Sequence, residues 1–181
     1  MNKLIVVYGT VSSGKSTLAS RLAKTIACNH YSSDNIRTEL SGDIGGKSRG
    51  LTKDGKPFDV FNTLRERVEA DLLAGLHVVG DSTGMSLDFK QMVNEFREKY
   101  DSSVVSLTLD FDTWKQREAL RNDRWTLVDN NIEPVPFIMP KRAFNASTQV
   151  RLHREPDLMI DTSNLTTEEV FNRVWVFLHK G

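Results

Sequence analysis

Cysteine, long apolar runs and a net charge of either sign are scarce or absent in this chain of 181 residues. The single cysteine, Cys28, excludes an intrachain disulfide and a thiolate zinc cluster. No stretch approaches the ~18 consecutive apolar residues of a transmembrane helix, and the N-terminus lacks the pattern of a signal peptide. The formal net charge of +0 gives no global field that would draw the protein to nucleic acid or to a membrane. We therefore expect a cytoplasmic protein without a membrane partner.

What the chain does contain is a complete glycine-rich motif. Residues 9–16 fill the pattern G-x-x-x-x-G-K-[ST], which is that of the phosphate-binding P-loop. The β-branched run 4–8 before the motif predicts a buried strand, and the apolar spacing after it predicts a helix. In such a strand–loop–helix unit, backbone N–H groups and the positive end of the helix dipole converge on phosphate oxygens. The motif therefore predicts a site for a nucleoside triphosphate.

Two side chains of this loop have chemistry of their own. Lys15 is expected to reach the β- and γ-phosphates as a catalytic group, and the Ser16 hydroxyl is expected to ligate Mg²⁺. ATP and Mg²⁺ are accordingly the expected cofactors. The residues predicted to bind the nucleotide are Gly9, Ser12, Ser13, Gly14, Lys15, Ser16 and Thr17.

Strands and helices alternate along the sequence within one expected domain, residues 1–181. Apolar runs predict five strands, at 4–8, 29–33, 76–81, 104–109 and 157–161. Periodicity and capping signals predict helices after the P-loop, at 34–40, 59–74, 87–99, from about 112, at 135–145 and after a capping box at 166–169. Residues 41–57 and 121–135 are expected to be loops. The alternation predicts an α/β fold with a doubly wound, mostly parallel sheet of five strands flanked by helices.

Three acidic residues, Asp34, Asp81 and Asp110, each stand at or just after the end of a predicted strand. The carboxyl ends of parallel strands meet at one edge of the sheet, and folds of this kind bind their ligands at that edge. We therefore expect these carboxylates to lie near the P-loop. Asp34 also fits the position of a helix N-cap.

A P-loop alone does not distinguish kinases from GTPases and from motor or transport ATPases. The guanine-reading sequence N-K-x-D is absent, and the chain is short for a transporter or helicase ATPase module. Four short motifs follow the P-loop, at 33–37, 79–83, 121–124 and 135–136. With its motifs in this order, the chain resembles phage and bacterial polynucleotide 5′-kinases. It also shares parts of its plan with zeta-toxin-like and small-molecule P-loop kinases.

The resemblance extends from Leu4 to the terminal helix and implies the three-layer P-loop kinase fold with a small lid at about 121–135. It implies that Asp34 is the catalytic base that takes the proton of the acceptor hydroxyl. Arg37, one helical turn further on, would bind the substrate by neutralising a phosphate of the acceptor. A plain N-cap for Asp34 and a solvated charge for Arg37 are the alternatives.

The resemblance also implies catalytic arginines in the lid. Arg121 and Arg124 would stabilise charge on the transferred γ-phosphoryl group. The choice between them stays open, because residues 125–127 replace the glycine-basic stretch of the resembling kinases. Solvated charges at a helix end are the alternative for both arginines. Asp81 would hold the Mg²⁺ shell or bind the acceptor hydroxyl, with Thr83 as a further substrate contact; an Asx-turn residue is the alternative for Asp81.

Basic residues lie in two stretches that would track a polyanionic acceptor. They are Lys47, Arg49, Lys53 and Lys56 in the loop 41–57, and Lys141, Arg142, Arg151 and Arg154 further on. Solvated loop charges are the alternative.

We favour an ATP-dependent kinase that phosphorylates a hydroxyl of DNA or RNA, most simply the 5′-OH. The other readings are a kinase of a hydroxymethylated base in DNA, a kinase of a nucleoside, sugar nucleotide or antibiotic, and a non-catalytic nucleotide-binding module. The sequence carries no signal for oligomeric state.

Overall fold

A computed structural model describes residues 3–41, 58–128, 144, 148, 150 and 152–180, with the backbone alone between 121 and 128. The strands are β1 (Leu4–Gly9), β2 (Asn29–Ser32), β3 (Val78–Ser82), β4 (Ser102–Thr108) and β5 (Leu158–Asp161). The helices are α1 (Lys15–Thr25), α2 (Ser33–Ser41), α3 (Val60–Leu73), α4 (Leu87–Lys99), α5 (Phe111–Val128) and α7 (Thr167–Leu178). Among the helices of these residues, none combines the length and the apolar character needed to cross a bilayer.

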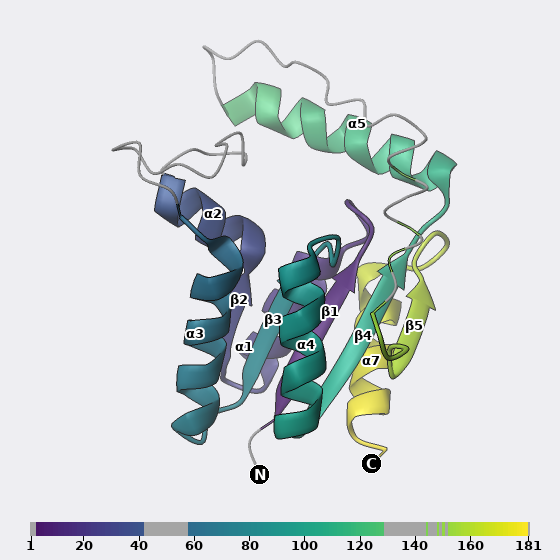
Figure 1. Ribbon diagram of the computed structural model, residues 1–181. Helices are drawn as coiled ribbons and strands as arrows, with labels where there is room; N and C mark the ends of the chain where they lie inside the picture. The colour runs from purple at the N-terminus through teal and green to yellow at the C-terminus, as the bar shows by residue number, and fades with distance from the viewer. Residues whose placement is uncertain are drawn as a thin grey trace.

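The sheet has the strand order β2-β3-β1-β4-β5, and every pairing in it is parallel. The strand that leads into the P-loop, β1, therefore lies at the centre of the sheet, between β3 and β4. In the register of β1 and β3, Val7 is opposite Asp81, so the acidic end of β3 lies beside the start of the P-loop. The predicted α/β fold with a five-stranded parallel sheet flanked by helices is confirmed (Figure 1).

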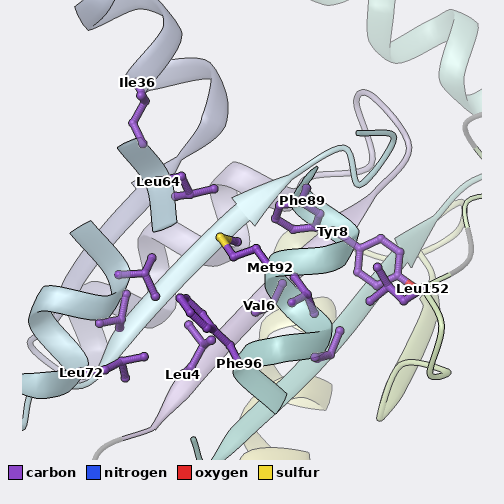
Figure 2. Packing of buried hydrophobic residues seen from close by; sticks show 14 of the residues in the cluster. Leu4, Val6, Tyr8, Ile36, Leu64, Leu72, Phe89, Met92, Phe96 and Leu152 are labelled. Carbon is purple, nitrogen blue, oxygen red and sulfur yellow. The ribbon is translucent and has the colours of Figure 1, made fainter. Parts of the chain in front are cut away.

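Side chains of β1 alternate between two apolar clusters, one on each face of the sheet. Leu4, Val6 and Tyr8 pack with apolar residues of α2, α3 and α4 (Figure 2). Ile5 and Val7 pack with residues of α1 and α7 on the other face. All five side chains are buried, so the sheet is the middle of three layers. Burial on both faces fixes the position of the strand from which the P-loop departs.

Three helices begin close to the positions at which the sequence predicts them to start, and each begins with a side-chain N-cap. Asp59 N-caps α3, and Ser86 N-caps α4. Thr166 and Glu169 form both halves of the capping box that opens α7. Each cap is a hydrogen bond between residues two or three positions apart, which is why sequence alone predicts it.

The predicted start of the second helix is wrong in detail. α2 begins at Ser33, so Asp34 lies inside the first helical turn and is not the N-cap. The Ser32 hydroxyl instead accepts a hydrogen bond from the Asp34 backbone N–H at 3.3 Å. Because Ser32 can also accept this capping hydrogen bond, α2 begins one residue earlier than predicted. The carboxylate of Asp34 is thereby left for another partner.

The predicted loop 121–135 is wrong in its first half, because α5 continues to Val128. Residues 111–133 contain neither glycine nor proline, so no local signal ends the helix. The prediction of a loop relied on the polar character of residues 121–135, but polar residues such as arginine are also good helix formers. The rest of the predicted lid, residues 42–57 and most of the predicted helix 135–145 lie outside the described residues.

Candidate active site

The P-loop connects the end of β1 to the start of α1. Gly14 occupies the N-cap position of α1 in a left-handed conformation, with φ 91°. In the described residues, no side chain caps this helix. The N–H groups at the start of a helix and the positive end of its dipole attract an anion where no side chain caps them. This arrangement binds phosphate.

Gly9, the last residue of β1, lets the P-loop leave the sheet close to β4. Its φ is 142°, and a Cβ atom at this position would lie 1.9 Å from the carbonyl oxygen of Leu107. The same oxygen accepts a hydrogen bond from the Thr10 backbone N–H at 3.2 Å. Only a residue without a side chain permits this approach of the two backbones.

We expect Gly9→Ala to lower the free energy of unfolding by roughly 3 kcal/mol, because the added methyl group meets the backbone of a paired strand. Gly75→Ala is the matched control. Gly75 also has a positive φ, 80°, but its Cβ would meet nothing within 4 Å. It should cost only about 1 kcal/mol, the strain of the left-handed conformation. Urea unfolding compares the two variants, and equal losses would contradict the steric role of Gly9.

The first two residues of α1 contact different groups. Lys15 is buried, and its Nζ donates to the Thr10 carbonyl oxygen at 2.8 Å across the loop. Ser16 Oγ donates to Asp81 Oδ2 at 2.9 Å. The two residues predicted for the metal, Ser16 and Asp81, are thus together in the structure. A hydroxyl and a carboxylate beside a phosphate loop fit Mg²⁺, which proteins bind through one or two side chains together with phosphate oxygens.

Asp81 has a second partner, which sequence reasoning missed. Asp81 is buried at the end of β3, and its Oδ1 lies 2.6 Å from His30 Nε2 on the neighbouring strand β2. Because a carboxylate oxygen accepts, the ring Nε2 is the donor of this bond. The four histidines show no metal-ligand spacing in the sequence, so nothing selects His30 before β2 is known to pair with β3.

We expect His30→Ala to loosen Asp81, because removing one hydrogen-bond partner of a buried polar group costs about 1–3 kcal/mol of stability. The Mg²⁺ concentration needed for half-maximal nucleotide binding should rise as well. His77→Ala is the matched control, since His77 is exposed and accepts a surface hydrogen bond from the Lys3 backbone N–H. Thermal unfolding and Mg²⁺-dependent nucleotide binding measure the two effects. A His30 variant that matches the His77 variant in both would rule out this role.

A cavity of about 840 Å³ opens at the P-loop. Its described lining includes Lys15 and Ser16 from α1, Asp34 from α2 and Thr83, which follows β3. Asp34 has 70% of its side chain exposed, and its Oδ1 accepts from Arg37 Nη1 at 2.7 Å. The cavity therefore brings together the predicted phosphate-binding lysine, the predicted base and one predicted acceptor contact. Arg37 lies beside them through its ion pair with Asp34.

Arg117 on α5 also lines the cavity and was not found from the sequence. Its Nη2 donates to the Thr162 carbonyl oxygen at 2.6 Å, and its Nη1 contacts Thr162 Oγ1 at 3.1 Å and the Ser12 carbonyl oxygen at 3.3 Å. Arg117 thus joins the P-loop, α5 and the segment after β5. No motif singles out this arginine, since its nearness to the P-loop depends on the path of α5 over the sheet edge.

The remaining predicted residues lie on or before α5. Arg121 and Arg124 belong to the helical backbone of α5, and their side chains lie outside the described residues. Asp110 fixes the start of α5. The backbone N–H of Thr113, the hydroxyl of Ser163 and the hydroxyl of Thr113 lower the pKa of Asp110 to about 2. Asp110 is not among the described residues that line the cavity.

The parallel sheet, the P-loop and the carboxylates at its edge define the P-loop kinase fold. A sugar kinase from Janibacter sp. HTCC2649 has a similar structure, with 16% identity, a TM-score of 0.64 and coverage of 98% of this chain and 95% of that chain. The Mycobacterium tuberculosis APS kinase CysC in complex with AMPPNP and APS has 19% identity, a TM-score of 0.59 and coverage of 99% and 98%. The Pnkp1/Rnl/Hen1 RNA repair complex has 21% identity, a TM-score of 0.60 and coverage of 81% and 43%. At these identities the likeness establishes the fold.

The family model described as an AAA domain matches residues 4–133, and the chain belongs to this family. A search of the curated proteins gives no match. The matched region contains the P-loop, Asp34, Asp81 and the whole of α5. The fold expected from the resemblance to P-loop kinases is confirmed, whereas the roles of individual site residues and the polynucleotide acceptor stay predictions.

Proposed function

We propose that the protein is a kinase that transfers the γ-phosphate of ATP to a hydroxyl group. The observation that carries this proposal is the shared cavity, in which Lys15 and Ser16 of the P-loop and Asp34 and Thr83 of the neighbouring elements form one lining. A P-loop holds the nucleotide phosphates, and a carboxylate beside it meets the need of an alcohol acceptor for a proton-accepting group. The similar fold of a kinase in complex with AMPPNP supports ATP as the donor.

In the proposed reaction, the acceptor hydroxyl gives its proton to the Asp34 carboxylate while its oxygen forms a bond to the γ-phosphorus. The bond from the γ-phosphorus to the oxygen that bridges it to the β-phosphate breaks, which leaves ADP and a phosphorylated acceptor. Lys15 and the N–H groups at the start of α1 hold the β- and γ-phosphates in line. Bound Mg²⁺ would neutralise phosphate charge, held by Ser16 and Asp81. Arg121 and Arg124 of α5 are the proposed further sources of positive charge.

A hydroxyl of a nucleic acid, most simply the 5′-OH, is the acceptor that we propose first. Arg37 supports it, because a guanidinium beside the proposed base is suited to the phosphate that lies next to a terminal nucleoside. The likeness in fold to a chain of an RNA repair complex gives the same proposal independent support. A hydroxymethylated base inside DNA would use the same Arg37 contact.

A small-molecule acceptor is the second candidate, and the comparisons supply the observation that favours it. The sugar kinase and the APS kinase match this chain over nearly their whole length, whereas the match to the RNA repair complex covers 43% of that chain. The net charge of +0 also suits a small acceptor better than a polyanion.

Transfer of radiolabelled γ-phosphate to a panel of acceptors tests the proposal. The panel contains 5′-OH oligonucleotides of DNA and RNA, DNA with hydroxymethylated bases, nucleosides and simple sugars. Label on the oligonucleotide end supports the first acceptor, and label on a nucleoside or sugar supports the second. Binding of AMPPNP without transfer to any member of a broadened panel would support the non-catalytic module instead.

Salt dependence separates a polymer from a small molecule as acceptor. On a single strand, the logarithm of KM should rise with the logarithm of salt concentration by about 0.7 per phosphate contacted. Neutralising Lys47, Arg49, Lys53 and Lys56 together should flatten this slope and raise KM, with little change in kcat. The matched control neutralises four exposed basic residues that do not line the described cavity, Lys24, Lys115, Arg173 and Lys180. If the slope of log KM against log salt concentration is similar in both variants, the basic residues of 41–57 do not bind the acceptor and are solvated surface charges.

A further inference from the structure

Ser12, in the middle of the P-loop, has an unusual backbone conformation. Its φ is 61°, and among the described non-glycine residues only Ala27 shares a positive φ. The left-handed region is strained for an L-residue, because Cβ approaches the following carbonyl group. Such strain persists only where the surroundings hold it in place. The P-loop therefore needs contacts that hold Ser12 in this conformation.

Two neighbouring residues of α5 supply such contacts. Ser12 Oγ donates a hydrogen bond to Glu118 Oε1, and the Ser12 carbonyl oxygen accepts from Arg117 Nη1 at 3.3 Å. Glu118 is 8% exposed and is outside the described lining of the cavity, whereas Ser12 and Arg117 belong to it. Glu118 thus contacts the P-loop without forming part of the described lining of the cavity in which the phosphates are proposed to bind.

Arg117 is also held in relation to the rest of the site. Arg117 is held by both the carbonyl and the hydroxyl oxygen of Thr162, after β5, and the Thr162 hydroxyl contacts the Ser13 carbonyl oxygen at 3.3 Å. The helix that carries Arg117 and Glu118 continues without a break to Val128 and therefore includes Arg121 and Arg124. One continuous helix thus joins the P-loop at Ser12 to the proposed lid arginines, about one turn further along for Arg121 and about two for Arg124.

We propose that Glu118 is a positioning residue for nucleotide binding. By accepting the Ser12 hydroxyl, it holds Ser12 in the left-handed conformation that shapes the P-loop for phosphate, and it couples this shape to α5. The proposal rests on the proposed function, in that the ligand is ATP. It adds a residue that touches neither nucleotide nor acceptor and acts through Ser12.

A double-mutant cycle on AMPPNP binding in the presence of Mg²⁺ tests the proposal. Glu118→Ala should weaken binding about tenfold, which corresponds to ~1.4 kcal/mol and to the strain of one left-handed residue. Ser12→Ala should weaken it to a similar extent. Ser12→Gly supplies the reference affinity for a P-loop that needs no support at this position, because glycine adopts this φ without help. Adding Glu118→Ala to Ser12→Gly should change that reference affinity less than twofold. Glu118→Gln, which still accepts from Ser12, should retain most of the affinity.

Thermal unfolding without nucleotide accompanies each variant. If Glu118 serves only packing, Glu118→Ala lowers the melting temperature but weakens binding by the same factor in the Ser12 and the Ser12→Gly backgrounds, and this result overturns the proposal. Unchanged affinity of Glu118→Ala also overturns it. If the parent protein does not bind AMPPNP at all, the result rejects ATP as the ligand of the proposed function. It then also rejects the proposed coupling of Glu118 to nucleotide binding.

Discussion

Replacement of Lys15 by alanine is expected to lower the rate of phosphoryl transfer by about 10²–10³-fold while leaving the protein folded. Lys15 Nζ donates to the Thr10 carbonyl oxygen across the P-loop, and Lys15 lines the cavity in which the phosphates are proposed to bind. Charge that develops on the γ-phosphoryl group loses its fixed counter-charge when this ammonium group is removed. Single-turnover transfer of radiolabelled phosphate measures the loss.

Lys24→Ala is the matched control for this prediction, because Lys24 is an exposed lysine in the last turn of the same helix, α1. Its transfer rate should equal that of the parent protein. Thermal unfolding of both variants distinguishes lost chemistry from lost structure. A Lys15→Ala variant that is folded and turns over at a near-normal rate would mean that the P-loop is not the catalytic phosphate site.

The fold could be predicted from local signals because they agree with one another. The P-loop motif fixes a strand before it and a helix after it, and the capping residues Asp59, Ser86 and Thr166 start three further helices. Alternation of strands and helices then restricts the sheet to parallel pairing. Where local signals compete, as at Ser32 and Asp34, the boundary moves by a residue or more.

The site was predictable only where a residue lies in a motif or directly after a strand. Lys15, Ser16, Asp34 and Thr83 line one cavity, as the positions of their strands imply. The contacts between elements could not be read from the sequence. The partners His30 of Asp81 and Glu118 of Ser12 are 51 and 106 residues away along the chain, and each contact depends on how two elements lie side by side. Long-range packing, not composition, places them.

Asp34→Asn is expected to lower kcat by roughly 10²–10⁴-fold with little change in the affinity for ATP. The amide cannot take a proton from the acceptor hydroxyl, but it has nearly the same size and keeps an oxygen that can accept from Arg37. Because Asp34 is largely exposed and paired within one helical turn, the substitution should not disturb the packing of α2. Steady-state kinetics with the acceptor identified by the panel, together with AMPPNP binding, measures both quantities.

Asp112→Asn provides a closely matched control. Asp112 also lies in the first turn of a helix and pairs with the basic residue three positions on, Lys115, at 2.7 Å with 81% of its side chain exposed, yet it is outside the described lining of the cavity. If Asp34 matters only as a helix charge, the two variants should behave alike, because exposed ion pairs at this spacing contribute little. If Asp34 belongs to the metal site, AMPPNP binding in Mg²⁺ should weaken while the turnover of bound nucleotide persists. A large fall in kcat confined to Asp34→Asn, with AMPPNP affinity retained, is the result that the proposed base requires.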